Sequence, residues 1–105
     1  MDKLTVAGAL DAMAQAKSNF ARLLERPAFD VSLYRPEGTD PQTPHARDEL
    51  YVIASGTGTF FCDGRTAPFA PGDVLFVAKG MEHRFTDFTA DFSTWVIFIG
   101  ERPKA

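Results

Sequence analysis

Two patterns of hydrophobic and polar residues divide the chain, and the change between them falls at Pro27. Before it, mostly apolar residues follow one another at intervals of three and four positions: Leu10, Met13, Lys17, Phe20 and Leu24. This spacing is typical of one face of an α-helix. It predicts a helical segment over residues 5–26 that packs on the outside of the domain. A helix that binds a partner is the alternative.

After Pro27 the chain changes to short runs of β-branched and aromatic residues separated by turn residues, a pattern typical of all-β domains. The runs are Phe29–Arg35, Leu50–Ala54, Thr57–Cys62, Arg65–Phe69, Val74–Val77, His83–Phe85 and Phe92–Ile99. Between two of them, Asp63-Gly64 predicts a type I′ hairpin turn, which needs positive φ at both central residues. Short, numerous strands protect their edges best by closing on themselves. We therefore expect an antiparallel barrel over residues 29–100, with Phe76, Trp95 and Phe98 in its core.

Composition narrows the class of protein. At 105 residues the chain is expected to form one domain, and 45% hydrophobic and 24% charged residues are typical of a globular protein. The net charge is −3 and the basic residues are scattered among acids, which argues against nucleic acid binding. The lone cysteine, Cys62, cannot form an intrachain disulfide, so we expect a cytoplasmic protein. No apolar run is long enough for a membrane helix.

The two histidines of the chain lie in segments with ordered glycine, glutamate and turn residues. The first segment runs from Thr43 through His45 and Glu49 to Gly56, and the second from Gly72 through Gly80 to His83. Both resemble the paired signature motifs of the cupin superfamily. The resemblance spans about residues 29–100 and implies a double-stranded β-helix, or jelly roll, and a homodimer.

Three positions depart from the cupin motifs. Thr43 stands where the first histidine would be, Ala78 replaces a proline and Asp87 replaces an asparagine. Only the first departure affects a presumed ligand. We expect a water molecule in place of the missing imidazole, hydrogen-bonded to Thr43 or Gln42.

The resemblance implies that His45, Glu49 and His83 bind a divalent transition metal, Fe, Mn, Ni or Zn, since imidazole and carboxylate suit these ions. Four extended residues span about 13 Å, so His45 and Glu49 can meet at one ion only if the chain bends, for which Arg47-Asp48 is a plausible place. Two alternatives are open. The histidines could be core residues satisfied by hydrogen bonds, and Glu49 could pair with an arginine.

Alternation along the strands places further residues beside the ligands. Counting by twos from Glu49 puts Tyr51 and Ile53 on the ligand side, and counting from His83 puts Phe85 there. The open positions of a metal held by two histidines and a carboxylate suit catalysis on a small organic molecule, by dioxygenase or isomerase chemistry. A non-catalytic module that binds or senses a small ligand, with or without metal, is the alternative. A structural barrel filled by its own side chains is the third possibility.

Overall fold

The computed structural model describes residues 1–103, and its first element is an α-helix, α1 (Val6–Ala16). Thr5 caps the helix because its hydroxyl oxygen accepts a hydrogen bond of 3.0 Å from the Gly8 backbone N–H. Lys17 ends it in the left-handed conformation, with its N–H bonded to the Ala14 carbonyl. Within residues 1–103, no helix is both long and apolar enough to cross a membrane.

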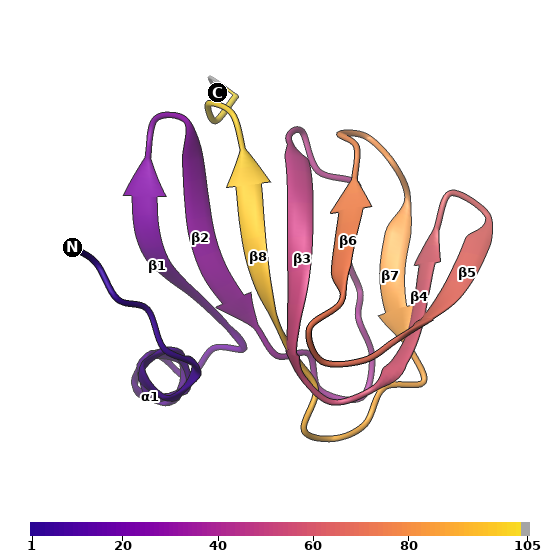
Figure 1. The fold of residues 1–105 in the computed structure, drawn as a ribbon, viewed down its shortest axis with the longest axis horizontal. Coiled ribbons are helices and arrows are strands. Elements are labelled where there is room, and N and C mark those ends of the chain that lie inside the picture. The colour runs from indigo at the N-terminus through magenta and orange to yellow at the C-terminus, as the bar shows by residue number, and fades with distance from the viewer. Residues whose placement is uncertain (104–105) are drawn as a thin grey trace.

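The helix predicted over residues 5–26 is wrong beyond Ala16, because its last third is a strand, β1 (Phe20–Arg26). This strand pairs antiparallel with β2 (Phe29–Tyr34), and the register shifts between Arg22 and Leu24. Residues 20–26 have good helix propensity, but pairing with a neighbouring strand outweighs it. As predicted, α1 packs on the outside of the strands, where its buried residues join a small core of Ala9, Met13, Ala21 and Leu33 (Figure 1).

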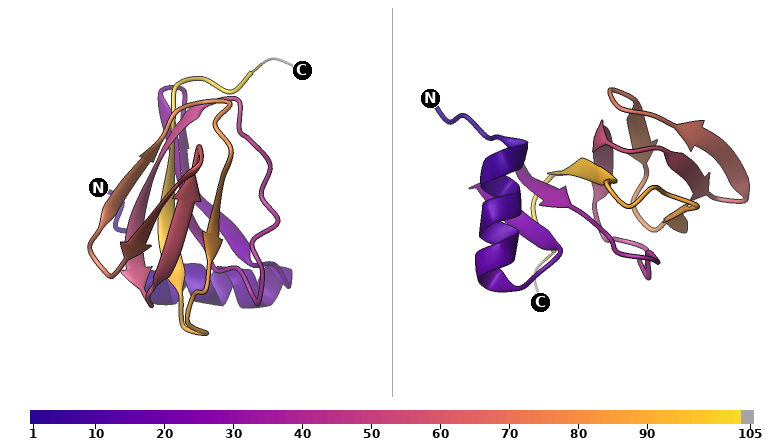
Figure 2. Two further views of the ribbon diagram at one scale, coloured as in Figure 1. Left: turned by 90° about the vertical axis from the view of Figure 1, so that its right-hand side faces the viewer. Right: turned by 90° about the horizontal axis from the view of Figure 1, so that it is seen from below.

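The remaining strands match the predicted runs closely. They are β3 (Asp48–Ser55), β4 (Gly58–Cys62), β5 (Arg65–Phe69), β6 (Val74–Val77), β7 (His83–Thr86) and β8 (Ser93–Ile99). One sheet has the order β1-β2-β8-β3-β6 and the other the order β5-β4-β7, with antiparallel pairing throughout. Figures 1 and 2 show the smaller sheet beside β6 and folded over toward the larger one, with α1 across the end of β1 and β2.

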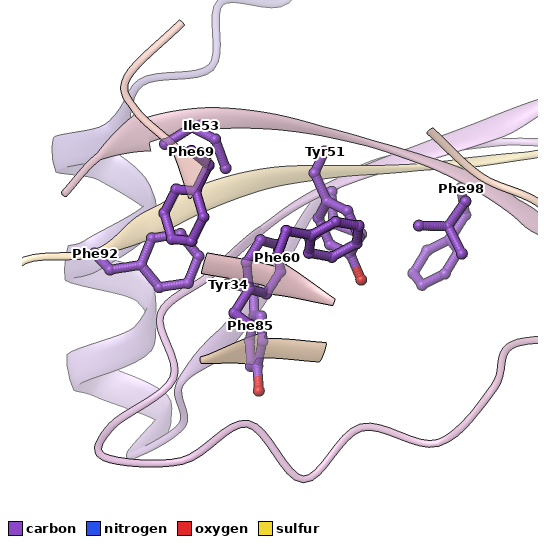
Figure 3. Close-up of a cluster of buried hydrophobic side chains, with 10 residues drawn as sticks. Tyr34, Tyr51, Ile53, Phe60, Phe69, Phe85, Phe92 and Phe98 are labelled. Carbon is purple, nitrogen blue, oxygen red and sulfur yellow. The ribbon is translucent and has the colours of Figure 1, made fainter. Parts of the chain in front are cut away.

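The main core lies between the two sheets and is largely aromatic. Figure 3 shows the rings in a row from Phe92 and Phe69 at one end to Tyr51 and Phe98 at the other. The alternation predicted on β3 is confirmed, since Glu49, Tyr51 and Ile53 are the buried residues of that strand. Trp95 packs against the small core beneath α1. The core position predicted for Phe76 is wrong, because its side chain is 57% exposed on β6.

Two left-handed residues, Asp63 with φ 49° and Gly64 with φ 79°, join β4 to β5, which confirms the predicted type I′ turn. Gly56 is left-handed too, with φ 82°, and it is crowded. A Cβ atom there would lie 2.6 Å from the Cα of Phe92. The closing glycine of the first motif is therefore required both by backbone conformation and by close packing against the segment before β8.

We predict that Gly56→Ala destabilises the protein more than Gly64→Ala does. Both substitutions impose the left-handed cost of about 1–2 kcal/mol, but the added methyl meets backbone only at Gly56, since nothing lies within 4 Å at Gly64. Urea unfolding followed by circular dichroism measures the two free energies of unfolding. Equal losses would contradict the close approach of Phe92.

Candidate metal site

The three predicted ligands come from two strands of opposite sheets and the loop before one of them. Glu49 lies near the start of β3 in the larger sheet, and His83 is the first residue of β7 in the smaller sheet. His45 lies in the loop three residues before β3. The site is therefore assembled where the two sheets face each other.

Two hydrogen bonds join the first motif to the second. The Gly80 N–H donates to the His45 carbonyl at 2.7 Å, and the Lys79 N–H donates to the Asp48 carboxylate at 2.8 Å. The chain bends at residues 46–47, one position earlier than the predicted Arg47-Asp48. The turn before His83 is thus bound directly to both sides of this bend.

A buried ionic cluster anchors the bend from the other side. Arg47 makes a two-pronged contact with the buried carboxylate of Asp30, which also contacts Arg22 and Arg102. Burial acts to raise the pKa of Asp30, but hydrogen bonds and charge from Arg47 and Arg102 outweigh it, so the pKa is lowered. Arg47 also lies over the ring of Phe98. Its side chain is therefore held on β2 and β8 and is not free to pair with Glu49, which removes one of the alternatives for that carboxylate.

The donor atoms of the three residues converge. One ligand atom from each of His45, Glu49 and His83 lies within 4.8 Å of the other two. Glu49 Oε1 is 2.9 Å from His83 Nε2 and 3.8 Å from His45 Nε2. Glu49 and His83 are buried, whereas the His45 side chain is 31% exposed. The cluster thus opens toward solvent on the His45 side.

Glu49 is the least satisfied polar group of the cluster. Its side chain is buried, and neither carboxylate oxygen accepts a hydrogen bond from any group in residues 1–103, despite the short distance to His83 Nε2. A buried carboxylate without hydrogen bonds is costly by several kcal/mol. A positive charge beside the carboxylate, on a protonated His83 or from a metal ion, would satisfy this position.

The protonation of the His83 ring determines which groups can satisfy Glu49. Nδ1 lies 2.9 Å from the Met81 carbonyl oxygen, which can only accept, so Nδ1 carries a proton, and in the neutral ring Nε2 directs its lone pair at the cluster. Burial acts to lower the pKa of His83, but the Glu49 carboxylate and the Met81 carbonyl outweigh it and raise the pKa. The surroundings of Nε2 thus favour a positive charge, from a proton or a metal ion.

The other histidine has the opposite balance. Burial lowers the pKa of His45, with only partial compensation from the charge of Glu49. The ring therefore favours its neutral form, which is the form that binds metals.

The loop before His45 supplies a fourth group, Gln42. Its Oε1 lies 3.0 Å from His45 Nε2, 3.3 Å from His83 Nε2 and 3.0 Å from the Tyr51 hydroxyl. Its Nε2 donates to Asp40 Oδ2 at 2.7 Å. Among the predicted neighbours of the ligands, Gln42 is thus at the centre of the cluster.

Asp40, which sequence reasoning missed, holds this loop against the barrel. Besides Gln42, its buried carboxylate accepts hydrogen bonds from the Tyr34 hydroxyl at 2.6 Å and the Phe85 N–H at 2.8 Å. An acidic residue between turn-forming prolines is typical of a solvated loop, so the sequence offered no signal for it.

The other predicted neighbours lie at different depths. The Tyr51 hydroxyl is 3.0 Å from His83 Nε2, directly at the cluster. Phe85 stacks edge-on against Tyr51, deeper in the aromatic core, and Ile53 is buried in the same core (Figure 3). Thr43 is exposed and makes no side-chain hydrogen bond within residues 1–103. The structure therefore brings Gln42 and Tyr51, but not Thr43, to the three donor atoms.

Comparison with known proteins identifies the family. The model of the Cupin domain family matches residues 31–98, which include both motifs. The chain belongs to the cupin family. Solved structures agree on the fold. One is an RmlC-like cupin with a double-stranded β-helix from Methanocaldococcus jannaschii, with a TM-score of 0.67 at 13% identity over 78% of this chain and 79% of that one. The predicted jelly roll is confirmed.

Two curated relatives are more similar in sequence. An uncharacterised protein of Streptomyces coelicolor is 32% identical over 81 residues, which cover 75% of this chain and 77% of that protein. The oxalate-binding protein of Thermotoga maritima is 33% identical over 73 residues, or 70% of this chain, and the match spans about half (54%) of that protein.

The donor set of this cupin domain fits a divalent transition metal. Donor distances of about 2.1 Å give separations of about 3.0 Å between adjacent ligands and about 4.2 Å between opposite ligands of an octahedral ion. The 2.9 Å and 3.8 Å separations from Glu49 Oε1 to the two imidazoles lie close to this range. The unpartnered carboxylate and the lone pair of His83 are the groups that such an ion would satisfy.

We predict that Tyr34→Phe lowers the free energy of unfolding by about 1–2 kcal/mol, because it removes a hydrogen bond to a charged, buried acceptor. The ring itself, which packs against Phe20, is kept. Thr43→Ala in the same region is the control and should change stability by less than about 0.5 kcal/mol. Urea unfolding measures both free energies of unfolding. If the value for Tyr34→Phe equals that of the wild type, the hydrogen bond from this hydroxyl to Asp40 does not stabilise the fold.

Proposed function

We propose that this cupin domain binds one divalent transition metal ion, Fe(II), Mn(II), Ni(II) or Zn(II), through His45, Glu49 and His83, and acts as a metal-dependent enzyme on a small organic molecule. The observation that carries the proposal is the buried Glu49 carboxylate, which has no hydrogen-bond donor within residues 1–103 and faces two imidazole nitrogens. When bound, the ion supplies a Lewis acid or an oxygen-binding centre with coordination positions open to a substrate.

The surroundings of the cluster limit the substrate to a small molecule. Aromatic rings fill the barrel beyond Tyr51, where Phe60 and Phe85 both contact its ring. Access is from the side of the partly exposed His45. A substrate therefore binds at the mouth of the barrel, beside His45 and Gln42, and does not enter the core.

Tyr51 is the group of the chain best placed to assist the reaction. Burial, and then the negative charge of Glu49, raise the pKa of its hydroxyl, so Oη keeps its proton. That hydroxyl lies within hydrogen-bond distance of His83 Nε2 and Gln42 Oε1. Its single proton is donated to Gln42 Oε1, so the hydroxyl can orient a substrate oxygen only by turning this proton toward it. Dioxygenase and isomerase chemistry are both compatible with these roles.

A non-catalytic role is the second candidate, and the oxalate-binding relative favours it. A small dicarboxylate could occupy the open positions of the metal and remain unchanged. Incubation of the metal-loaded protein with oxalate separates the two roles. Tight binding with all of the oxalate recovered after hours, and no turnover in a panel of small oxygen-bearing molecules, would support the binding module over the enzyme.

We predict that protein refolded with Zn(II) or Mn(II) retains about one ion per chain, and that His83→Ala retains less than a tenth of that amount. Glu82→Gln, an exposed neighbour paired with Arg84, is the matched control and should retain the full amount. Elemental analysis after gel filtration measures the content. The proposal is wrong if the wild-type protein holds no stoichiometric metal, or if His83→Ala holds as much metal as the wild type.

We also propose the homodimer that the family resemblance implies, with β6 in the contact. This strand is an edge of the larger sheet, and its Val74 and Phe76 side chains are 61% and 57% exposed. Exposed apolar residues on an edge strand favour pairing with another chain. Light scattering should give a dimer for the wild type and a monomer for Phe76→Glu. A monomeric wild type would contradict this contact.

A further inference from the structure

We propose that Gln42 Oε1 is a fourth protein ligand of the metal site, in place of the histidine that Thr43 replaces, and that Asp40 holds the amide in the orientation that ligation requires. This inference rests on the proposed metal binding and extends it. In this arrangement the Gln42 carbonyl oxygen takes the coordination position at which a water molecule was expected.

The orientation of the Gln42 amide follows from its partners. Its nitrogen lies 2.7 Å from Asp40 Oδ2, a carboxylate oxygen that can only accept. The amide nitrogen therefore faces Asp40, and the carbonyl oxygen faces His45 and His83. Asp40 cannot turn away, because the Tyr34 hydroxyl and the Phe85 N–H hold both of its oxygens.

Three acceptor atoms meet at one point of the cluster. His83 Nε2 presents a lone pair, since the ring proton is on Nδ1. It lies 3.3 Å from Gln42 Oε1 and 2.9 Å from Glu49 Oε1. Two of these atoms are uncharged acceptors in the neutral state of His83 and the third is anionic, so they repel one another unless a proton on Nε2 or a metal ion lies among them. Separations of 2.9–3.3 Å are those of adjacent ligands around one ion, about 3.0 Å.

The Tyr51 hydroxyl gives an alternative reason for the amide position, because it donates to Gln42 Oε1 at 3.0 Å. His45 Nε2, which lies 3.0 Å from the same oxygen, can be its second donor only in the tautomer that carries the proton on Nε2, and that tautomer cannot offer this nitrogen to a metal. A carbonyl oxygen has two lone pairs, so it can accept a hydrogen bond from Tyr51 and bind a metal ion at the same time. The tyrosine therefore acts as a second support of the ligand.

Binding of Co(II) alone tests this assignment, by competition with a chelator and by the visible spectrum of the bound ion. Gln42→Ala should weaken binding about tenfold or more and shift the spectrum, because water replaces a protein oxygen. Gln42→Glu keeps an oxygen donor but sets a second carboxylate against Asp40, so it should bind more tightly than Gln42→Ala. Thr43→Ala, the adjacent control, should stay within about twofold.

The role of Asp40 is tested by a double substitution. Asp40→Leu removes the acceptor of the Gln42 amide nitrogen, so the amide can turn this nitrogen toward the metal and Co(II) affinity should fall about tenfold. Adding Gln42→Glu should restore part of the affinity, since a carboxylate presents oxygen in either orientation. A purely structural loss from Asp40→Leu would not be rescued in this way. Unfolding in the presence of a chelator checks that each variant is folded.

The outcomes separate this inference from the proposed function. If Gln42→Ala binds Co(II) with the wild-type affinity and spectrum while His83→Ala does not bind, the fourth ligand is wrong and the three-residue site stands. Equal losses in Gln42→Ala and Gln42→Glu would also overturn it. If the wild type itself does not bind Co(II), both the site and this extension fail.

Discussion

A buried carboxylate without a hydrogen-bond donor in residues 1–103 is the constraint on which this structure depends. Glu49 lies on the inward face of β3, where the residues that follow it by twos belong to the core. The same alternation that packs Tyr51 and Ile53 therefore buries a charge beside them. Such a residue lowers the stability of the metal-free protein, and natural proteins retain costs of this kind where function requires them. The stability lost at Glu49 is the physical reason to regard the cluster as a site and not as part of the core.

The groups around Glu49 are held by contacts that do not involve the metal site itself. The Lys79–Gly80 turn binds the bend after His45, Asp30 holds Arg47, and Asp40 holds Gln42. Each contact ties the loop before β3 to a different part of the barrel. A candidate ligand set that lies partly on a loop needs this support. A small displacement of the loop is enough to move a donor atom out of the geometry that metal binding requires.

The sequence predicted the features that depend on neighbouring residues better than those that depend on tertiary contacts. Alternation and turn residues located seven strands and the Asp63-Gly64 turn, since these depend on neighbouring residues. β1 was mistaken for helix because its pairing with β2 is a tertiary contact that overrides propensity. Phe76 was placed in the core because hydrophobicity does not reveal which face of an edge strand is covered. The motifs indicated His45, Glu49 and His83, whereas the role of Asp40 arises only from the folded loop.

The departures from the cupin motifs have different physical consequences. Asp87, in place of asparagine, adopts a left-handed φ of 51°, a conformation that both residue types tolerate better than most, so the backbone of the second motif is kept despite the change. Thr43 changes the chemistry of the first motif, because its exposed hydroxyl does not reach the cluster. The neighbouring Gln42 reaches it from one position earlier in the loop, with an oxygen donor in place of an imidazole. If Gln42 is a ligand as proposed, its carbonyl oxygen is a harder and weaker donor than an imidazole nitrogen, and metal preference shifts toward ions that accept mixed nitrogen and oxygen donors.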